Sequence, residues 1–124
     1  MKWTPLLVIA VIVVLIFLLK KSGEISTKDA QARLKDGALV IDVRSPGEFD
    51  SGHLPSAINI PLDEIESALP RRIKDKNQVL LLHCQSGMRS GMAKQKLKSM
   101  GYTHAYNLGS LSRAKQVVGS TGEP

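Results

Sequence analysis

The sequence predicts an α/β fold, in which a central parallel sheet of about five strands is covered by helices on both faces and preceded by one transmembrane helix. Short apolar runs alternate with segments of helical periodicity, which is typical of parallel strands joined by crossover helices. The chain has 124 residues, a length that suits one domain. The run from Trp3 to Leu19 is almost wholly apolar, unlike the remainder of the chain.

This apolar run favours a membrane anchor. As a helix it would be roughly 25 Å long, at the short end of a membrane span, and Trp3 at its edge suits a membrane interface. A cleaved signal peptide would need small residues before a cleavage point, and residues 18–23 lack that pattern. A core helix would not be apolar on every side. We therefore expect residues 1–21 to form the anchor, with residues 3–19 in contact with the membrane.

Charges beside the run set the expected orientation. Lys20 and Lys21 follow it directly and further basic residues lie close behind, whereas only Lys2 and the amino terminus precede it. Cytoplasmic segments carry the excess of Lys and Arg, and a free thiol suits the same compartment. We expect a single-pass membrane protein whose main domain lies on the cytoplasmic rather than the periplasmic side.

Residues 22–118 are predicted to form that domain, with a flexible tail over residues 119–124. Ser26 or Thr27 can cap the first helix, which ends at Gly37. The expected strands cover residues 39–43, 57–60, 79–83 and 103–108. Further helices are expected over residues 62–69, 91–100 and 111–118, with Pro70 limiting the first of these. Residues 46–50 are expected to form a short helix or a turn.

Composition narrows the possible partners. The formal charge is +6, but three of the positive charges flank the apolar run and the rest are dispersed. The sequence has no basic stripe interleaved with aromatic residues, so we expect no nucleic-acid partner. One cysteine cannot form an intramolecular disulfide. That cysteine and three scattered histidines lack the spacing of metal ligands, so we expect no metal site.

The stretch from Val79 to Ser90 carries the chemistry. An apolar strand delivers Cys84, the only cysteine, to a short loop with Gly87 and Arg89, and a helix follows. The loop and the first helical turn have inward N–H groups without internal partners, which favour negative charge and hence the reactive thiolate. Arg89 could grip an oxyanion in two-point fashion or form a structural salt bridge that shapes the loop. A lone cysteine could also be a small buried apolar residue.

Nearby polar residues are assigned by position. His83 precedes the cysteine, and neighbours along a strand point to opposite faces, so His83 is not expected to be the base. Asp42 in a buried strand requires a partner, and Arg44 is the obvious candidate. Asp42 and Glu48 could be interpreted as an acid–base pair, although a structural role with Arg44 is favoured. Gly87 is expected to supply a positive φ, or space, in the tight loop.

Four segments together resemble a single-domain rhodanese, or thiosulfate sulfurtransferase. They are Ile41-Asp-Val-Arg44, Glu48-Phe49, Gly52-His-Leu-Pro-Ser-Ala-Ile-Asn-Ile-Pro61 and Cys84-Gln-Ser-Gly-Met-Arg-Ser90. The resemblance covers about residues 24–118 and implies a rhodanese-like fold. It implies that Cys84 is the catalytic nucleophile and carries a persulfide. It implies that Gln85, Ser86, Gly87, Met88, Arg89 and Ser90 form the substrate-binding loop.

The implied reaction moves a sulfane sulfur from an anion such as thiosulfate to cyanide, a thiol or a protein acceptor, and needs no cofactor. The alternative is a membrane-tethered sulfur-relay or protein-binding module with little free turnover. A Cys-dependent phosphatase of related fold places its arginine six positions after the cysteine, whereas Arg89 is five after Cys84. The shorter ring suits a sulfur atom rather than a phosphate.

Two positions depart from the family pattern. Gln85 stands where the family often has a basic residue, which leaves less positive charge for a sulfonate donor. Gly109-Ser110 stands where a Gly-Gly pair is common, and Ala114 stands near a position often occupied by tryptophan.

Overall fold

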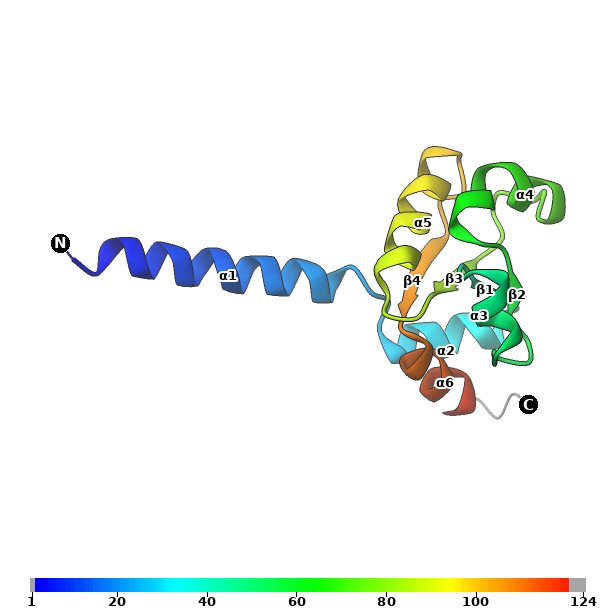
Figure 1. Cartoon of the computed structure of the whole chain (residues 1–124), viewed down its shortest axis with the longest axis horizontal. Helices are drawn as coiled ribbons and strands as arrows, with labels where there is room; N and C mark the ends of the chain where they lie inside the picture. Colours follow the sequence, from blue (N-terminus) through cyan, green and yellow to red (C-terminus); the bar gives the residue numbers. More distant parts are fainter. Residues whose placement is uncertain (1, 121–124) are drawn as a thin grey trace.

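The computed structural model describes residues 2–120, with the side chains of 18–22 and 120 left aside. Six α-helices and one 3-10 turn are assigned in this range: α1 Thr4–Ser22, α2 Thr27–Lys35, α3 Pro46–Asp50, η1 Leu62–Glu64, α4 Ile65–Arg72, α5 Met88–Ser99 and α6 Leu111–Ser120. The strands are β1 Leu39–Asp42, β2 Ile58–Asn59, β3 Leu80–His83 and β4 Ala105–Gly109. Figure 1 shows α1 extending from a compact α/β unit. The predicted tail, residues 119–124, includes the end of α6, and residues 121–124 lie outside the described range.

The four strands form one parallel sheet in the order β2-β1-β3-β4. The prediction of about five strands was therefore too high by one. At the outer edge of β4, Glu24 makes a single parallel bridge to Asn107, and the Ile25 N–H donates to the Asn107 carbonyl at 2.9 Å. The segment between the end of α1 and the Ser26 cap is too short to extend this bridge into a strand.

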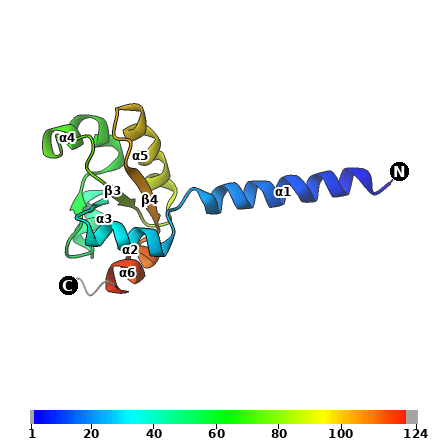
Figure 2. The same cartoon turned by 180° about the vertical axis from the view of Figure 1, so that it is seen from behind.

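Helices cover both faces of the sheet, as predicted, and the alternation of side chains along β3 divides the core in two. Leu80, Leu82 and Cys84 point into the cluster beneath α4 and α5. Leu81 points into the cluster beneath α2 and α6, which also contains Ala114. Figure 2 shows α2 and α6 together on the side of the sheet away from α4 and α5. All strands are parallel, so their carboxyl ends meet at one edge.

Local signals account for most helix ends. The Ser26 side chain accepts a hydrogen bond from the Asp29 N–H at 3.1 Å, which is the predicted cap of α2. Ser45 and Glu48 form a capping box on α3. The prediction that Pro70 would limit α4 was wrong by two residues. The helix continues to Arg72, since a proline removes one backbone donor without preventing the next turn from closing.

Helix α1 corrects the membrane prediction. Within the part of the chain that the structure describes, no helix combines the length and apolar character that crossing a bilayer requires. A crossing needs about 20 predominantly apolar residues, whereas the uncharged part of α1 ends before Lys20. The predicted transmembrane anchor over residues 1–21, the membrane contact through residues 3–19 and the membrane location were therefore wrong.

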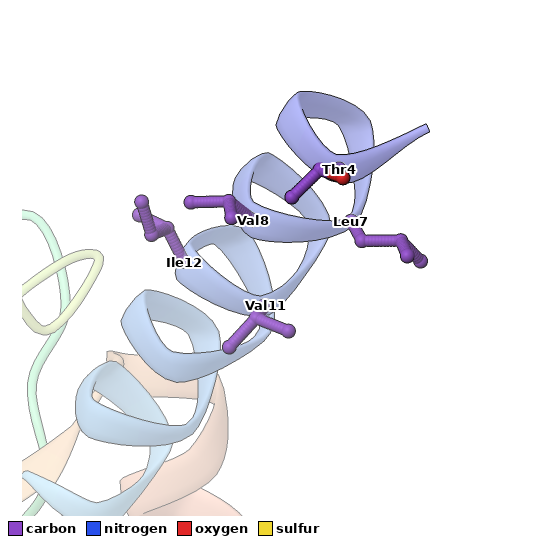
Figure 3. A pocket seen from close by; sticks show the side chains of 5 residues that line it. All are labelled: Thr4, Leu7, Val8, Val11 and Ile12. Carbon is purple, nitrogen blue, oxygen red and sulfur yellow. The ribbon is translucent and has the colours of Figure 1, made fainter. Parts of the chain in front are cut away.

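Over residues 4–17, where the side chains of α1 are described, the helix forms an open surface rather than an enclosed site. Figure 3 shows Thr4, Leu7, Val8, Val11 and Ile12 projecting from this helix. These five side chains line an open hollow of about 260 Å³. All five belong to one helix, and none of them carries a nucleophilic or titratable group suited to the chemistry predicted for Cys84.

Tyr102 ties the end of α5 to the segment after α4. Its ring is 1% exposed, and its hydroxyl donates to the Ile73 carbonyl at 2.6 Å. Replacing Tyr102 with Phe leaves that buried carbonyl without its donor, so we expect the free energy of unfolding to fall by about 1–2 kcal/mol in urea titrations. Tyr106→Phe is the control, since Tyr106 is only partly buried, and should change stability by less than about 0.5 kcal/mol. Equal losses in both variants would contradict this role for the Tyr102 hydroxyl.

Candidate active site

The loop after β3 is shorter than the sequence indicated. Cys84 follows the last residue of β3, and Gly87 adopts φ +97°, the predicted positive value, as the residue preceding α5. The helix was expected to begin at Gly91 but begins at Met88. The left-handed turn at Gly87, which L-residues disfavour, lets the chain enter the helix three residues early. Gln85 to Gly87 therefore form the loop, and Met88 to Ser90 form the first helical turn.

The sulfur of Cys84 lies under this turn. The Gly87 N–H donates to Sγ at 2.9 Å, and the Ser90 hydroxyl lies 3.5 Å from it. The cysteine is 0% exposed and packs on the cluster beneath α5. Both sequence interpretations are thus partly met: the thiol is buried, yet backbone N–H groups face it.

Burial and the hydrogen bonds have opposite effects on the pKa of the Cys84 thiol. Burial alone would raise the pKa of the Cys84 thiol, because a charged sulfur is poorly solvated there. Hydrogen bonds from the Ser90 side chain and from the backbone of Ser90, Gly87 and Ser86 act in the opposite direction and outweigh burial. The pKa of Cys84 therefore lies below its ordinary value, as a reactive thiol requires.

The turn between β4 and α6 supports the loop from behind. The Cys84 N–H donates to the Gly109 carbonyl at 3.2 Å, and Ser86 bridges to Ser110. A Cβ at Gly87 would lie in van der Waals contact with the Gly109 carbonyl carbon, at 3.4 Å, and the φ of +97° would be strained for any other residue. The loop is thus packed directly on a second backbone turn.

Arg89 is engaged in a salt bridge. Its Nη1 and Nη2 donate to Oε1 and Oε2 of Glu48 at 2.7 and 2.9 Å. The pair holds the pKa of Glu48 at about 2, first through the hydrogen bond from Arg89 and then through the Ser45 backbone. Of the two roles considered for Arg89, the structure contains the salt bridge that fixes the loop to α3. The pairing of Glu48 with Arg89, which is 41 positions away, was not predicted.

A buried polar cluster lies below the loop, on β1 and β3. Arg44 donates to both carboxylate oxygens of Asp42 at 2.8–3.0 Å, which confirms the predicted pairing. Arg44 also donates to Oε1 of Gln85 at 3.3 Å. Gln85, which replaces the basic residue common in the family, thus contacts a buried cation.

His83 is fully buried in this cluster. Its Nδ1 lies 3.2 Å from the Cys84 carbonyl, and its Nε2 lies 3.7 Å from Oδ2 of Asp42. Burial lowers the pKa of His83, and the nearby Asp42 opposes this only in part. Neither ring nitrogen is hydrogen-bonded to Sγ among the described residues, so His83 is not placed to act as a base on the thiol.

Asn107 joins the site from β4 and was not predicted. Its Oδ1 accepts from the Ser90 hydroxyl at 2.7 Å, and its Nδ2 donates to the Gly87 carbonyl at 3.1 Å. A signal was available: an asparagine within the apolar strand Ala105–Gly109 requires partners when buried. Sequence periodicity could not say which partners these would be.

Two surface clefts flank the first turn of α5. One, of about 320 Å³, is lined by Glu24, Gly87, Met88, Gly91 and Asn107. The other, of about 340 Å³, is lined by Val43, Ser45, Pro61, Leu62, Asp63, Arg89 and Lys96. Met88 is 74% exposed and forms part of the first wall rather than packing in the core. Small molecules can therefore approach the loop from either side.

Comparison with known proteins agrees with this arrangement. The model of the Rhodanese-like domain family matches residues 26–114. The chain is 44% identical over 71 residues to thiosulfate sulfurtransferase PspE of Escherichia coli, a match that covers 57% of this chain and 68% of that protein. It is 35% identical over 96 residues to the thiosulfate:glutathione sulfurtransferase of Homo sapiens, covering 67% and 84% of the two chains.

Solved structures give the same result for the fold. A rhodanese from E. coli, described as containing anions, aligns with a TM-score of 0.60 and 40% identity over 62% of this chain and 91% of its own. A human single-domain sulfurtransferase aligns with a TM-score of 0.65 and 31% identity over 76% and 96% of the two chains. The parallel sheet, the cysteine at the carboxyl end of β3 and the family match over most of the chain lead to one conclusion: the chain belongs to the rhodanese-like domain family.

Proposed function

We propose that this protein is a sulfurtransferase that moves a sulfane sulfur from a donor such as thiosulfate to a thiol or cyanide acceptor, through a persulfide on Cys84. The reacting unit is the domain over residues 22–118, with Gln85 to Ser90 as the substrate-binding loop. The observation that carries the proposal is the set of N–H donors around Sγ, which lowers the pKa of a thiol that burial would otherwise keep neutral. The thiolate is the nucleophile in sulfur exchange.

In the first half-reaction, the Cys84 thiolate attacks the outer sulfur of the donor. The new S–S bond forms as the donor's own S–S bond breaks, and sulfite leaves with the bonding electron pair. The product is a persulfide anion on Cys84. Covalent catalysis of this kind divides one difficult transfer into two easier steps.

In the second half-reaction, the acceptor attacks the outer sulfur of the persulfide. The Cys84 thiolate departs with the electron pair, and the acceptor leaves as thiocyanate or as a persulfide. Charge stays on sulfur throughout. The fixed N–H donors of Ser86, Gly87 and Ser90 can therefore stabilise it in both steps without reorganising.

Binding of the donor's oxyanion falls mainly to the backbone of the loop and the N-terminus of α5. Arg89 forms an ion pair with Glu48, and Arg44 forms one with Asp42. Each guanidinium therefore contributes its positive electrostatic potential and holds the loop in place. Gln85 offers a neutral side chain bound to Arg44 in place of a free cation. A donor need not carry a strongly charged sulfonate to fit this loop.

Sulfur loading of Cys84 is the first test. After incubation of the full chain with thiosulfate, intact mass spectrometry under non-reducing conditions should detect one added sulfur atom. Cyanide or dithiothreitol should remove it. In Cys84→Ala the mass should not change, because no thiolate is available to form the bond.

Two outcomes of that experiment would count against the proposal. If thiosulfate adds no sulfur but polysulfide does, the donor assignment is wrong and the persulfide chemistry stands. If neither donor adds sulfur to a chain whose Cys84 is reduced, the sulfurtransferase proposal fails.

The Glu48–Arg89 pair gives a prediction for stability against pH. The pKa of Glu48 is lowered from 4.5 to about 2 by folding. The pair therefore contributes stability fully above about pH 4.5, and the contribution is lost as the pH falls through about 2. In urea titrations between about pH 6 and pH 2, Glu48→Gln should be less stable than wild type at the upper end, and the difference should shrink toward the lower end.

Glu64→Gln is the matched control, because Glu64 is also a glutamate near a helix N-terminus and forms no ion pair among the residues that the structure describes. It should follow the wild-type pH profile. A constant stability gap between Glu48→Gln and wild type over the whole pH range would show that the salt bridge does not titrate as described.

A further inference from the structure

Asn107 has a side-chain amide whose orientation is fixed by its neighbours. The Gly109 N–H donates at 2.9 Å to Oδ1 of Asn107, and only the amide oxygen can accept this bond. The Gly87 carbonyl accepts at 3.1 Å from the other atom, which must be the nitrogen. The residue is 7% exposed, so water does not replace these partners freely. Oxygen therefore faces Ser90.

This orientation determines where the Ser90 proton lies. The Ser90 Oγ is 2.7 Å from Oδ1 of Asn107, and an amide oxygen can only accept, so the hydroxyl donates to it. The Gly87 carbonyl, 3.1 Å from the same Oγ, already accepts from the Gly91 N–H and from Asn107. A hydroxyl has a single proton. While Asn107 holds it, Ser90 presents only a lone pair toward Sγ at 3.5 Å.

A lone pair suits the neutral thiol, which can donate its S–H to Oγ. It does not suit a thiolate or a persulfide anion, which needs a donor. Rotation about the Cβ–Oγ bond of Ser90 would turn the proton from Asn107 to sulfur without moving a heavy atom. Oδ1 would then keep its bond from Gly109. The hydroxyl thus has two competing acceptors, and the charge on sulfur selects between them.

We propose that Asn107 is a positioning residue that holds the Ser90 hydroxyl beside Cys84 and takes its proton whenever the sulfur is neutral. Asn107 does not touch the sulfur and acts through Ser90. The inference rests on the proposed function only in taking the Cys84 sulfur as the reacting atom.

The other charged and titratable residues near Asn107 and Ser90 are not substituted in the test. Glu24 shares a cleft with Asn107, and Arg89 lies on the same helix turn as Ser90. Asp42 and Arg44 lie on β1, and His83 lies next to the cysteine on β3. None of them is changed in the variants below, so differences report on Asn107 and Ser90.

The test measures the pH at which Cys84 becomes reactive, from the pH dependence of its alkylation by iodoacetamide in the full chain. Asn107→Leu has nearly the same shape and removes the competing acceptor, so the midpoint should fall by up to about one unit. Asn107→Asp keeps the oxygen, binds the Ser90 proton more strongly and adds negative charge, so the midpoint should rise by about one unit or more. A structural role alone would move both variants in one direction.

The decisive comparison repeats the Asn107 substitutions in a chain that also carries Ser90→Ala. Without the hydroxyl, Asn107→Leu should no longer shift the midpoint, and Asn107→Asp should raise it only by its charge. Persistence of the full Asn107→Leu shift in Ser90→Ala, or shifts of the same sign in the two Asn107 variants, would overturn the proposal. If Asn107→Leu does not fold, as judged by thermal melting, a smaller Asn107→Asp shift in Ser90→Ala than in wild type supports the proposal, and an equal shift overturns it.

Sulfur loading of the same variants separates this inference from the proposed function. If Cys84 alkylates with the expected shifts but thiosulfate and polysulfide never add sulfur, the sulfurtransferase proposal fails and the role of Asn107 stands. If sulfur is added normally and the shifts in alkylation midpoint are absent, the role of Asn107 is wrong and the sulfurtransferase proposal stands.

Discussion

The sulfur of Cys84 lies between an apolar core that disfavours its charge and a turn of backbone N–H groups that favours it. Burial is the largest single influence on this thiol, and it acts against ionisation. The hydrogen bonds from Ser86, Gly87 and Ser90 together exceed it. Because a dry site strengthens each of these bonds, the same burial that disfavours an isolated charge makes the turn effective. The rest of the fold holds this turn in place around Sγ of Cys84.

Distant parts of the chain hold the turn in place. Glu48 on α3 binds Arg89, Arg44 after β1 binds Gln85, and Asn107 on β4 binds both Ser90 and the Gly87 carbonyl. The parallel order of the sheet brings the carboxyl ends of β1, β3 and β4 to one edge, which is where ligands bind in sheets of this kind. Each contact joins residues far apart in sequence. The loop is therefore preorganised by the complete domain rather than by its own residues.

Local patterns in the sequence predicted most of the helices and strands and the place of Cys84 directly after a strand. The apolar run before Cys84 could only be a buried strand, and Gly87 was the natural place for a positive φ, which it has. The start of α5 at Met88 was missed because the entry into the helix depends on that left-handed turn and not on helical periodicity. The partners of Glu48 and Asn107 were missed because contacts between residues far apart in sequence leave no local signal that identifies them. The sheet has four strands rather than about five, and the apolar run at the N-terminus was overinterpreted as a membrane span.

The central claim is that the folded chain ionises Cys84 more readily than its burial would allow. The ultraviolet absorbance of the thiolate, followed against pH, measures this directly for the single cysteine of the full chain. The same chain unfolded in urea gives the reference, expected near the ordinary thiol value of about 8.5. We expect the folded midpoint to lie clearly below the unfolded one. A folded midpoint at or above the unfolded value would mean that burial prevails over the N–H donors and would contradict the account.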